Sequence, residues 1–223
     1  MYDLFILTTA IDRPDLHNKS LKPFFEDLNK QGIKYLWIVN LDSVFKRVDE
    51  ALLNFESFIV ENKIIRSSKN PCFFNAASYL MGTARSRFED LKEEGKILWL
   101  EDDWDYNIKF NVKEIINTDY EYIGFHFHHL FEFSLNPSMW SKDFFLNNVY
   151  FPFIINKGKK DPEKLLIDYH KKQKEIDPNH FKSVKKISFG GVFKDLGRTW
   201  MNKNDHSKKK WKKNQEENSI TYS

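Results

Sequence analysis

Residues 97–105 read ILWLEDDWD, an apolar run that ends in three consecutive carboxylates, with a fourth two residues later. An apolar run of this kind packs inside a sheet. Adjacent negative charges beside a buried strand repel one another and are poorly solvated, so each carboxylate tends to hold a proton or to attract a cation. The segment therefore predicts a strand with a cation at its carboxyl end.

Glu101, Asp102 and Asp103 offer only oxygen atoms as ligands. Such ligands suit Mg²⁺ or Mn²⁺, which keep some waters and recruit substrate phosphates to complete an octahedron. The alternative interpretation is an acidic strand-to-loop transition whose charges pair with surface lysines.

The composition of the whole chain indicates a folded protein. Its 223 residues are 41% hydrophobic and include 21 Phe, 9 Tyr and 6 Trp, which is too much apolar mass for a disordered chain. No apolar run approaches the ~20 residues that span a bilayer, and the N-terminus lacks the features of a signal peptide. The single Cys72 excludes an internal disulfide and a multi-cysteine zinc site. We expect a soluble, cytoplasmic protein.

The net charge of +3 is unevenly distributed. Residues 203–223 contain six lysines and three acids, so this tail carries the whole net charge. The segment KKKWKKN at 208–214 is the part of the chain best suited to bind a polyanion.

The order of elements predicts a parallel sheet. Apolar, β-prone runs alternate with segments of helical spacing through the first hundred residues, which indicates parallel strands joined by crossover helices. The expected strands are 2–9, 33–40, either 57–60 or 63–67, and 96–100; the expected helices are 13–32, 43–55 and 74–92. Pro14 begins the first helix, Gly32 ends it, and Pro23 should kink it.

The pattern changes after Asp105. Residues 120–136 alternate aromatic and polar side chains, as in a half-exposed antiparallel strand. Residues 161–176 read as a helix with acids in its first turn and lysines later. The predicted fold class is therefore α/β, with a mostly parallel central sheet flanked by helices and a smaller antiparallel region.

Four segments in order resemble the GT-A-fold glycosyltransferases. LEDDW at 100–104 resembles their metal-binding Asp-x-Asp motif, ILTTAIDRPDLHNKSLKPF at 6–24 resembles their first strand and helix, WIVNLDS at 37–43 their second strand, and FFNAASYLMGTAR at 73–85 the helix before the metal motif. The usual Asp-Asp-Gly of the second strand is absent. The resemblance covers about residues 1–105 well and the rest loosely.

The resemblance implies a transferase that uses a nucleotide-sugar donor, with a UDP-sugar favoured, and a saccharide acceptor, rather than a nucleic acid. Asp103, Glu101 and a late histidine, His206, would hold Mn²⁺ or Mg²⁺. Asp42 would accept a hydrogen bond from the base. The donor contacts expected in total are Thr9, Arg13, Asp42, Asn75, Arg85, Glu101, Asp102 and Arg198.

The second half would bind the acceptor. Asn136, Trp140 and Ser141 are the expected saccharide contacts, because sugars present apolar faces to aromatic rings and hydroxyls to amides. Asp161 or Glu163 would be the general base of an inverting reaction, although both are also ordinary helix-start residues. Asp143 and Asp105 are weaker candidates for the base, and if none of these acids serves, a retaining mechanism stays open.

The resemblance also implies the domain organisation. Residues 1–206 would form one catalytic domain, with 1–105 as the donor-binding half and 106–206 as the acceptor-binding half, followed by the basic tail 207–223. The Lys-, Asn-, Ile- and Phe-rich composition is similar to that of glycosyltransferases from large DNA viruses, which would act in the host cytoplasm, or from bacterial surface-glycan clusters.

Two other function classes remain open at the level of sequence. Clustered acids and a divalent ion also serve metal-dependent nucleases and phosphotransferases. The chain could instead be a polyanion-binding module that uses the basic tail. A zinc site at His126, His128 and His129 is disfavoured, since only the first two share a face of a strand.

Overall fold

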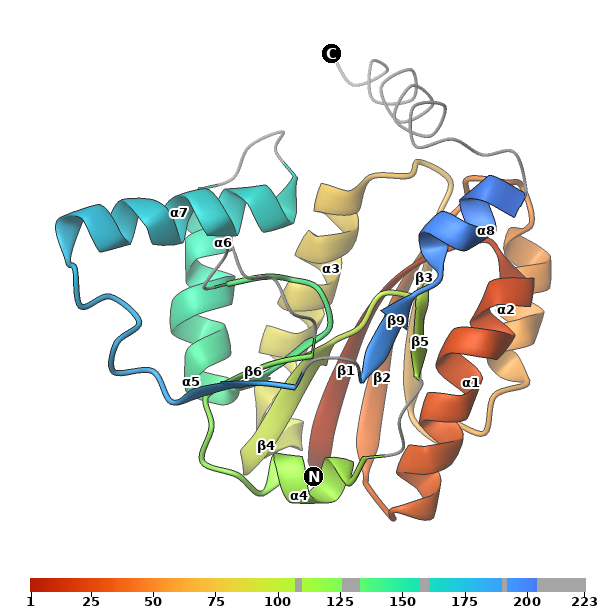
Figure 1. The fold of residues 1–223 in the computed structure, drawn as a ribbon. Coiled ribbons are helices and arrows are strands. Elements are labelled where there is room, and N and C mark those ends of the chain that lie inside the picture. The colour runs from red at the N-terminus through yellow and green to blue at the C-terminus, as the bar shows by residue number, and fades with distance from the viewer. Residues whose placement is uncertain (107–109, 126–132, 157–160, 190–191, 204–223) are drawn as a thin grey trace.

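The computed structural model describes residues 1–106, 110–125, 133–156, 161–189 and 192–203, with the side chains of Arg198, Met201 and Asn202 left out. Figure 1 shows a central sheet with helices on both faces. The first half contains β1 (Tyr2–Ile11), α1 (Pro14–Lys30), β2 (Tyr35–Asp42), α2 (Val48–Glu56), β3 (Lys63–Ser68), α3 (Phe73–Ser86), the 3₁₀ turn η1 (Phe88–Asp90) and β4 (Leu91–Trp99). The second half contains β5 (Trp104–Tyr106), α4 (Val112–Ile116), β6 (Tyr122–Gly124), β7 (Ser138–Ser141), α5 (Lys142–Phe144), the π-helix η2 (Phe145–Tyr150), α6 (Phe151–Ile155), α7 (Pro162–Ile176), β8 (Lys186–Ser188), β9 (Phe193–Asp195) and α8 (Gly197–Lys203).

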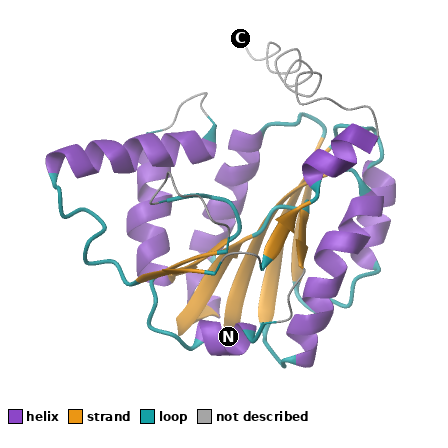
Figure 2. Ribbon diagram, in the orientation of Figure 1, coloured by secondary structure: helices purple, strands orange, loops and turns teal. Residues whose placement is uncertain are grey.

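The main sheet has seven strands in the order β3-β2-β1-β4-β7-β6-β8. Strands β3, β2, β1 and β4 are mutually parallel, whereas β7 is antiparallel to both β4 and β6. Strands β5 and β9 form a separate antiparallel pair, and both sheets are visible in Figure 2. This arrangement confirms the predicted α/β class with a mostly parallel sheet and a smaller antiparallel region.

The parallel strands are buried on both faces. All eight residues of β2 are buried, as expected where helices cover both sides of a parallel sheet. Side chains of α1 and α2 pack on one face, and those of α3, η2, α6 and α7 pack on the other. The molecule therefore has three layers, helix on sheet on helix.

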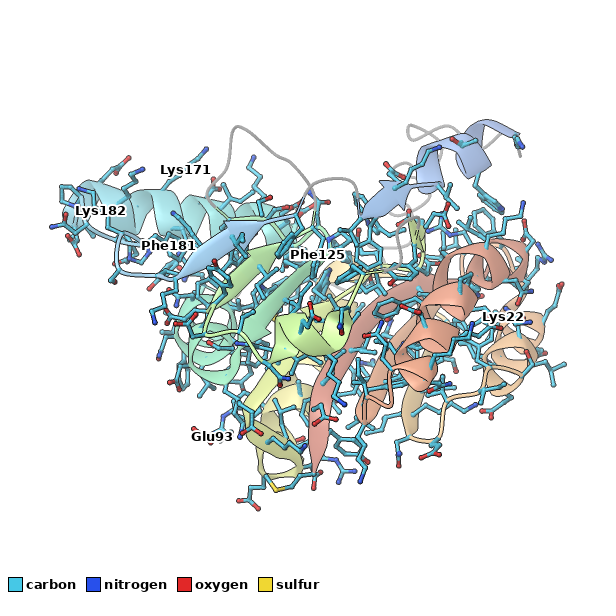
Figure 3. The ribbon with its side chains drawn as sticks, turned by 60° about the horizontal axis from the view of Figure 1, so that its bottom comes forward. Lys22, Glu93, Phe125, Lys171, Phe181 and Lys182 are labelled. Atoms are coloured by element: carbon cyan, nitrogen blue, oxygen red, sulfur yellow. The ribbon has the colours of Figure 1, made fainter. Side chains whose placement is uncertain are left out.

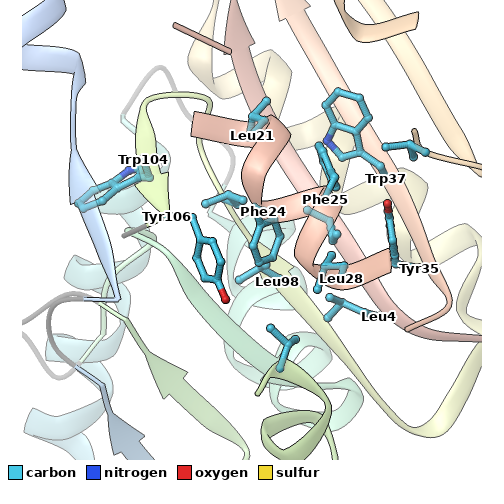
Figure 4. Packing of buried hydrophobic residues seen from close by; sticks show 14 of the residues in the cluster. Leu4, Leu21, Phe24, Phe25, Leu28, Tyr35, Trp37, Leu98, Trp104 and Tyr106 are labelled. Atoms are coloured by element: carbon cyan, nitrogen blue, oxygen red, sulfur yellow. The ribbon is translucent and has the colours of Figure 1, made fainter. Parts of the chain in front are cut away.

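Aromatic packing between α1 and β2 dominates the first core. The Phe25 ring lies 4.7 Å from the ring of Trp37 and 5.7 Å from that of Tyr35, and Figure 4 shows Leu28 beside them. Burying each such side chain contributes ~1.5–3 kcal/mol. Figure 3 shows charged side chains such as Lys22 and Glu93 at the periphery.

Two expected helix boundaries are wrong. Helix α2 begins at Val48 rather than at Ser43, because the intervening loop is held by a buried carboxylate described below. Helix α3 ends at Ser86 rather than at Lys92, since Leu91 already pairs with Tyr2 as the first residue of β4. The strand expected at either 57–60 or 63–67 is β3, at the second position.

The remaining predicted elements are present, with two corrections: β4 begins at Leu91 rather than at 96, and the strand predicted at 120–136 is limited, among its described residues, to Tyr122–Gly124, since the described residues 133–136 form a loop. Helix α1 begins at Pro14 and continues through Pro23, and Gly32 follows it with a φ of +67° that favours glycine. Helix α7 spans the predicted segment, with Asp161 as its N-cap. The strand expected at 120–136 is represented by β6, and 126–132 with its three histidines lies outside the described residues. Within the described part of the chain, no helix combines the length and apolar character needed to cross a bilayer.

Candidate functional site

The acidic segment is carried to the carboxyl edge of the sheet by continued pairing with β1. Leu100 N donates to Leu7 O at 3.0 Å and Asp102 N donates to Thr9 O at 3.1 Å, beyond the end of β4. The carboxylates therefore lie where ligands bind in open α/β sheets.

Alternation along this strand sends Asp102 toward α1. Leu98 and Leu100 belong to the core beneath α1 and α2, and Asp102 continues the same face because side chains repeat every second residue. Its backbone carbonyl accepts a hydrogen bond from Ser20 Oγ at 2.5 Å. The side chain is consequently buried, at 3% exposure.

Four donors surround the Asp102 carboxylate. Arg13 binds it with Nη2 at 2.7 Å from Oδ1 and Nε at 3.1 Å from Oδ2. Ile11 N and His17 Nε2 donate to Oδ2 at 3.2 and 3.0 Å, and the same His17 nitrogen also donates to Ile11 O at 2.9 Å. Although burial alone would raise the pKa of Asp102, Arg13 and His17 hold it well below its usual range. Asp102 thus has the contacts of a structural anchor.

Glu101 and Asp103 are less well compensated. Glu101 Oε2 accepts from Trp104 Nε1 at 3.0 Å. Asp103 Oδ2 lies 3.1 Å from Arg13 Nη2, and its side chain is 24% exposed. Burial, followed by the charge of Asp103, raises the pKa of Glu101. Burial likewise raises the pKa of Asp103, and Arg13 offsets only part of that effect. Both groups are therefore placed to gain from an added cation.

A cavity of about 340 Å³ opens at this edge. It is bordered by the carboxyl ends of β1, β2 and β4, by the start of α3 and α7, and by the junction of β9 and α8. Its described lining includes seven acids and one basic residue: Asp42, Glu101, Asp102, Asp103, Asp161, Glu163, Asp195 and Arg13. Thr9 and Asn136, also predicted from sequence, line it too.

The side chains that line the cavity decide whether it can bind a metal ion. Among the described residues, no three His, Cys, Asp or Glu side chains are arranged to hold an ion by themselves. Mg²⁺ and Mn²⁺ commonly need only one or two carboxylates when substrate phosphates and water supply the other ligands. Asp103 and Glu101 fit that lesser requirement.

The start of α7 forms one wall of the cavity. Glu163 Oε1 accepts from Ser134 Oγ at 2.6 Å and from Leu135 N at 3.1 Å. Asp161 Oδ1 accepts from the backbone of Glu163 and Lys164 at 2.9 and 3.2 Å. Each acid is thus oriented through one of its two oxygens.

The end of β2 forms the opposite wall. Asp42 accepts from Asn40 Nδ2 at 2.8 Å and from Cys72 N at 3.1 Å. Burial raises the pKa of Asp42 to about 6, and the two hydrogen bonds offset only part of this effect.

Several predicted contacts lie away from the cavity. Strand β7 starts at the site edge and runs away from it, antiparallel to β4, so Trp140 and Ser141 pair with Ile97 and Lys96 further back. Trp140 is fully buried, and Ser141 Oγ accepts from Phe144 N to cap α5. Asn136, which precedes the strand, remains at the edge.

The donor contacts expected on α3 are also displaced. Arg85 lies twelve residues beyond Phe73, or ~18 Å along a helix whose start faces the cavity, and its guanidinium lies over Phe88. Asn75 is exposed on α3 and does not line the cavity. Arg198 belongs to α8, but its side chain is not described, and His206 lies outside the described residues.

Sequence reasoning missed Asp195 and Gly197. They reach the site because β9 pairs with β5, opposing Asp195 to Trp104, and Leu196 N donates to Asp103 O at 2.8 Å. A Cβ on Gly197 would collide with Asp103 Oδ2, so a larger residue there would have to displace the Asp103 carboxylate. No local sequence pattern predicts this long-range strand pairing.

Comparisons with known proteins support the fold. No family model and no curated protein match the sequence. Solved structures do match, among them a mannosyltransferase of Pyrobaculum calidifontis in complex with GDP-Man and Mn²⁺ (10% identity, TM-score 0.52), covering 86% of this chain and 55% of that one. A candidate nucleotide-diphospho-sugar transferase of Desulfovibrio desulfuricans matches at 10% identity and TM-score 0.50, covering 85% and 80%. The chain thus spans about half the length of the mannosyltransferase and has a GT-A-like fold.

The Asp102 network should be a main determinant of stability. Replacing Asp102 by Ala leaves the guanidinium of Arg13 buried beside Asp103 alone, so we expect a loss of ~3 kcal/mol in the free energy of unfolding. Urea unfolding followed by circular dichroism measures it. Asp90→Ala, which removes an exposed ion pair with Arg87, is the matched control and should change the midpoint little. Equal midpoints for the two variants would contradict the anchoring role.

Proposed function

We propose that this chain is a metal-dependent glycosyltransferase that moves a sugar from a nucleotide-sugar donor to a hydroxyl of a glycan or another acceptor. The observation that carries the proposal is the single cavity that gathers the acids after β4, Asp42 after β2 and the start of α7. The GT-A-like fold supports it, since a solved structure of similar fold is a mannosyltransferase in complex with GDP-Man and Mn²⁺.

Asp103 is the proposed metal ligand, with Glu101 as a second carboxylate or a partner of a metal-bound water. Asp103 is the more exposed of the two aspartates that contact Arg13, and the raised pKa of both carboxyls shows incomplete charge compensation. When bound, a divalent ion would neutralise the charge that develops on the leaving diphosphate. Arg13 Nη2, 3.1 Å from Asp103 Oδ2, would orient the Asp103 carboxylate.

Glu163 is the proposed general base of an inverting reaction. Ser134 Oγ and Leu135 N fix Glu163 Oε1, which orients the carboxylate toward the cavity. In the reaction the acceptor hydroxyl would give its proton to this carboxylate while its oxygen forms the new bond to the sugar, as the bond between the sugar and the diphosphate breaks and the nucleoside diphosphate leaves. Asn136 is the proposed acceptor contact, supported by its position in the cavity lining and by the hydrogen bond that its Nδ2 donates to Ser134 Oγ at 2.7 Å.

Metal-dependent nucleotide binding tests the proposal directly. We expect one of the UDP-, GDP-, CMP- or dTDP-sugars to raise the melting temperature only with Mn²⁺, and Asp103→Asn to abolish that rise, because the ligand charge is removed without loss of volume. Asp105→Asn, two residues along and outside the described lining, is the control. Stabilisation that ignores both metal and Asp103→Asn would contradict the proposal, as would Mn²⁺-dependent hydrolysis of DNA or RNA without any response to nucleotide sugars.

Donor affinity should depend on pH through Asp42. An ionised carboxylate accepts a hydrogen bond from the base more strongly than a protonated one, and with a pKa of about 6 only about a tenth of Asp42 is ionised at pH 5. The ratio of nucleoside diphosphate affinity to pyrophosphate affinity should therefore fall about tenfold between pH 7.5 and pH 5. Titration calorimetry measures the affinity of each ligand. Taking the ratio of the two affinities removes the effect of protonation at the metal site. Asp42→Asn should remove this fall of the affinity ratio at low pH. A fall that persists in this variant would show that another group causes it.

Removal of the base should affect turnover rather than donor binding. We expect Glu163→Gln to lower kcat by about 10²- to 10⁴-fold with an unchanged donor Kd. Asp161→Asn is the matched variant and should have a smaller effect, since Asp161 chiefly caps α7. A loss of turnover confined to Asp161→Asn would identify that residue as the base, and normal turnover in both would rule out the inverting assignment made here.

A further inference from the structure

The loop between β2 and α2 has a fixed shape and contributes Phe45 to the lining of the cavity. Asp12 is fully buried, and its carboxylate accepts from Val44 N at 2.8 Å, Phe45 N at 2.7 Å and Arg47 N at 2.6 Å. Three backbone donors on one carboxylate leave this loop little freedom. Phe45 lines the cavity, as does Asp42 three residues earlier.

Trp200 of α8 supports Phe45 from outside the described lining of the cavity. The two rings lie 5.2 Å apart, and Trp200 Nε1 donates to Asp15 Oδ2 at 2.7 Å. The Arg13 guanidinium lies 5.6 Å from the centre of the same indole. Helix α8 is thereby fixed beside the start of α1, where Figure 1 shows it.

We propose that the nucleobase of the donor stacks on Phe45 and that Trp200 holds this ring in place, so that α8 is a determinant of donor affinity. This inference rests on the proposed function and adds the residues that would bind the base. Asp42 would accept from the edge of the base, whereas Phe45 would contact its face. Every nucleobase has such a face, so stacking supplies affinity and leaves the choice of base to groups such as Asp42.

The test separates the base from the diphosphate. We would titrate UDP, GDP, CMP and dTDP, and separately pyrophosphate, in the presence of Mn²⁺ into the full chain and its variants. Phe45→Leu should weaken the best-bound nucleotide roughly 5- to 30-fold and leave pyrophosphate binding unchanged, while Phe45→Tyr should retain nucleotide binding. Trp200→Leu should cause a smaller loss with the same selectivity for the nucleotide, and Trp200→Phe, which keeps a ring against Phe45, should restore it.

The outcomes distinguish this inference from the proposed function. Phe151→Leu, at a half-exposed ring on α6 away from the cavity, is the matched control and should bind both ligands normally. If the unmodified chain binds none of the four nucleotides, the proposed function fails. If it binds nucleotide and Phe45→Leu binds equally well, or loses nucleotide and pyrophosphate in parallel, the stacking role is wrong. Loss of affinity in Trp200→Leu that the phenylalanine variant does not restore would refute the role of Trp200.

Discussion

The buried contact between Asp102 and Arg13 is the constraint on which the rest of the site depends. It joins the end of the central strand β4 to the start of α1, and His17 and Ser20 add two more connections from the same helix. Charged groups this deeply buried are tolerated only when they are paired and hydrogen-bonded. The pairing therefore fixes the chain direction after β4, and with it the positions of the flanking acids.

Three adjacent acids consequently have three different environments. Asp102 is saturated by donors and strongly acidic, whereas Glu101 has one donor and an elevated pKa. Asp103 shares Arg13 with Asp102 but keeps partial access to the cavity. Adjacent acids repel one another, which makes the sequence of this segment unusual. The repulsion is reduced because one acid faces a helix and the others face the cavity. One buried cation can compensate Asp102 fully and Asp103 only in part, which leaves the cavity with a negative charge.

The sequence predicted the layered sheet because periodicity is a local property. The apolar runs of β1, β2 and β4 and the capped helix α7 were readable from spacing alone. Local patterns could not show that Asp102 faces α1, since that follows from the register of β4 against β1, nor that β7 runs away from the edge and takes Trp140 into the core. Local patterns also could not predict that Asp195 lies opposite Trp104, about ninety residues away in the chain. The sequence identified the acids at helix starts as candidates from their residue type alone. Only the fold showed that they line the same cavity.

The glycine beside Asp103 has a consequence for how the protein is made. Gly197 packs its bare backbone against a carboxylate specified almost a hundred residues earlier, so the last described helix completes a wall begun by the central strand. The ribosome must release the chain as far as Gly197 before that wall can close. The amino-terminal half, although it carries the acidic segment, would emerge with the cavity open on one side. Competence for ligand would then arise only once α8 has emerged and packed against the acidic segment.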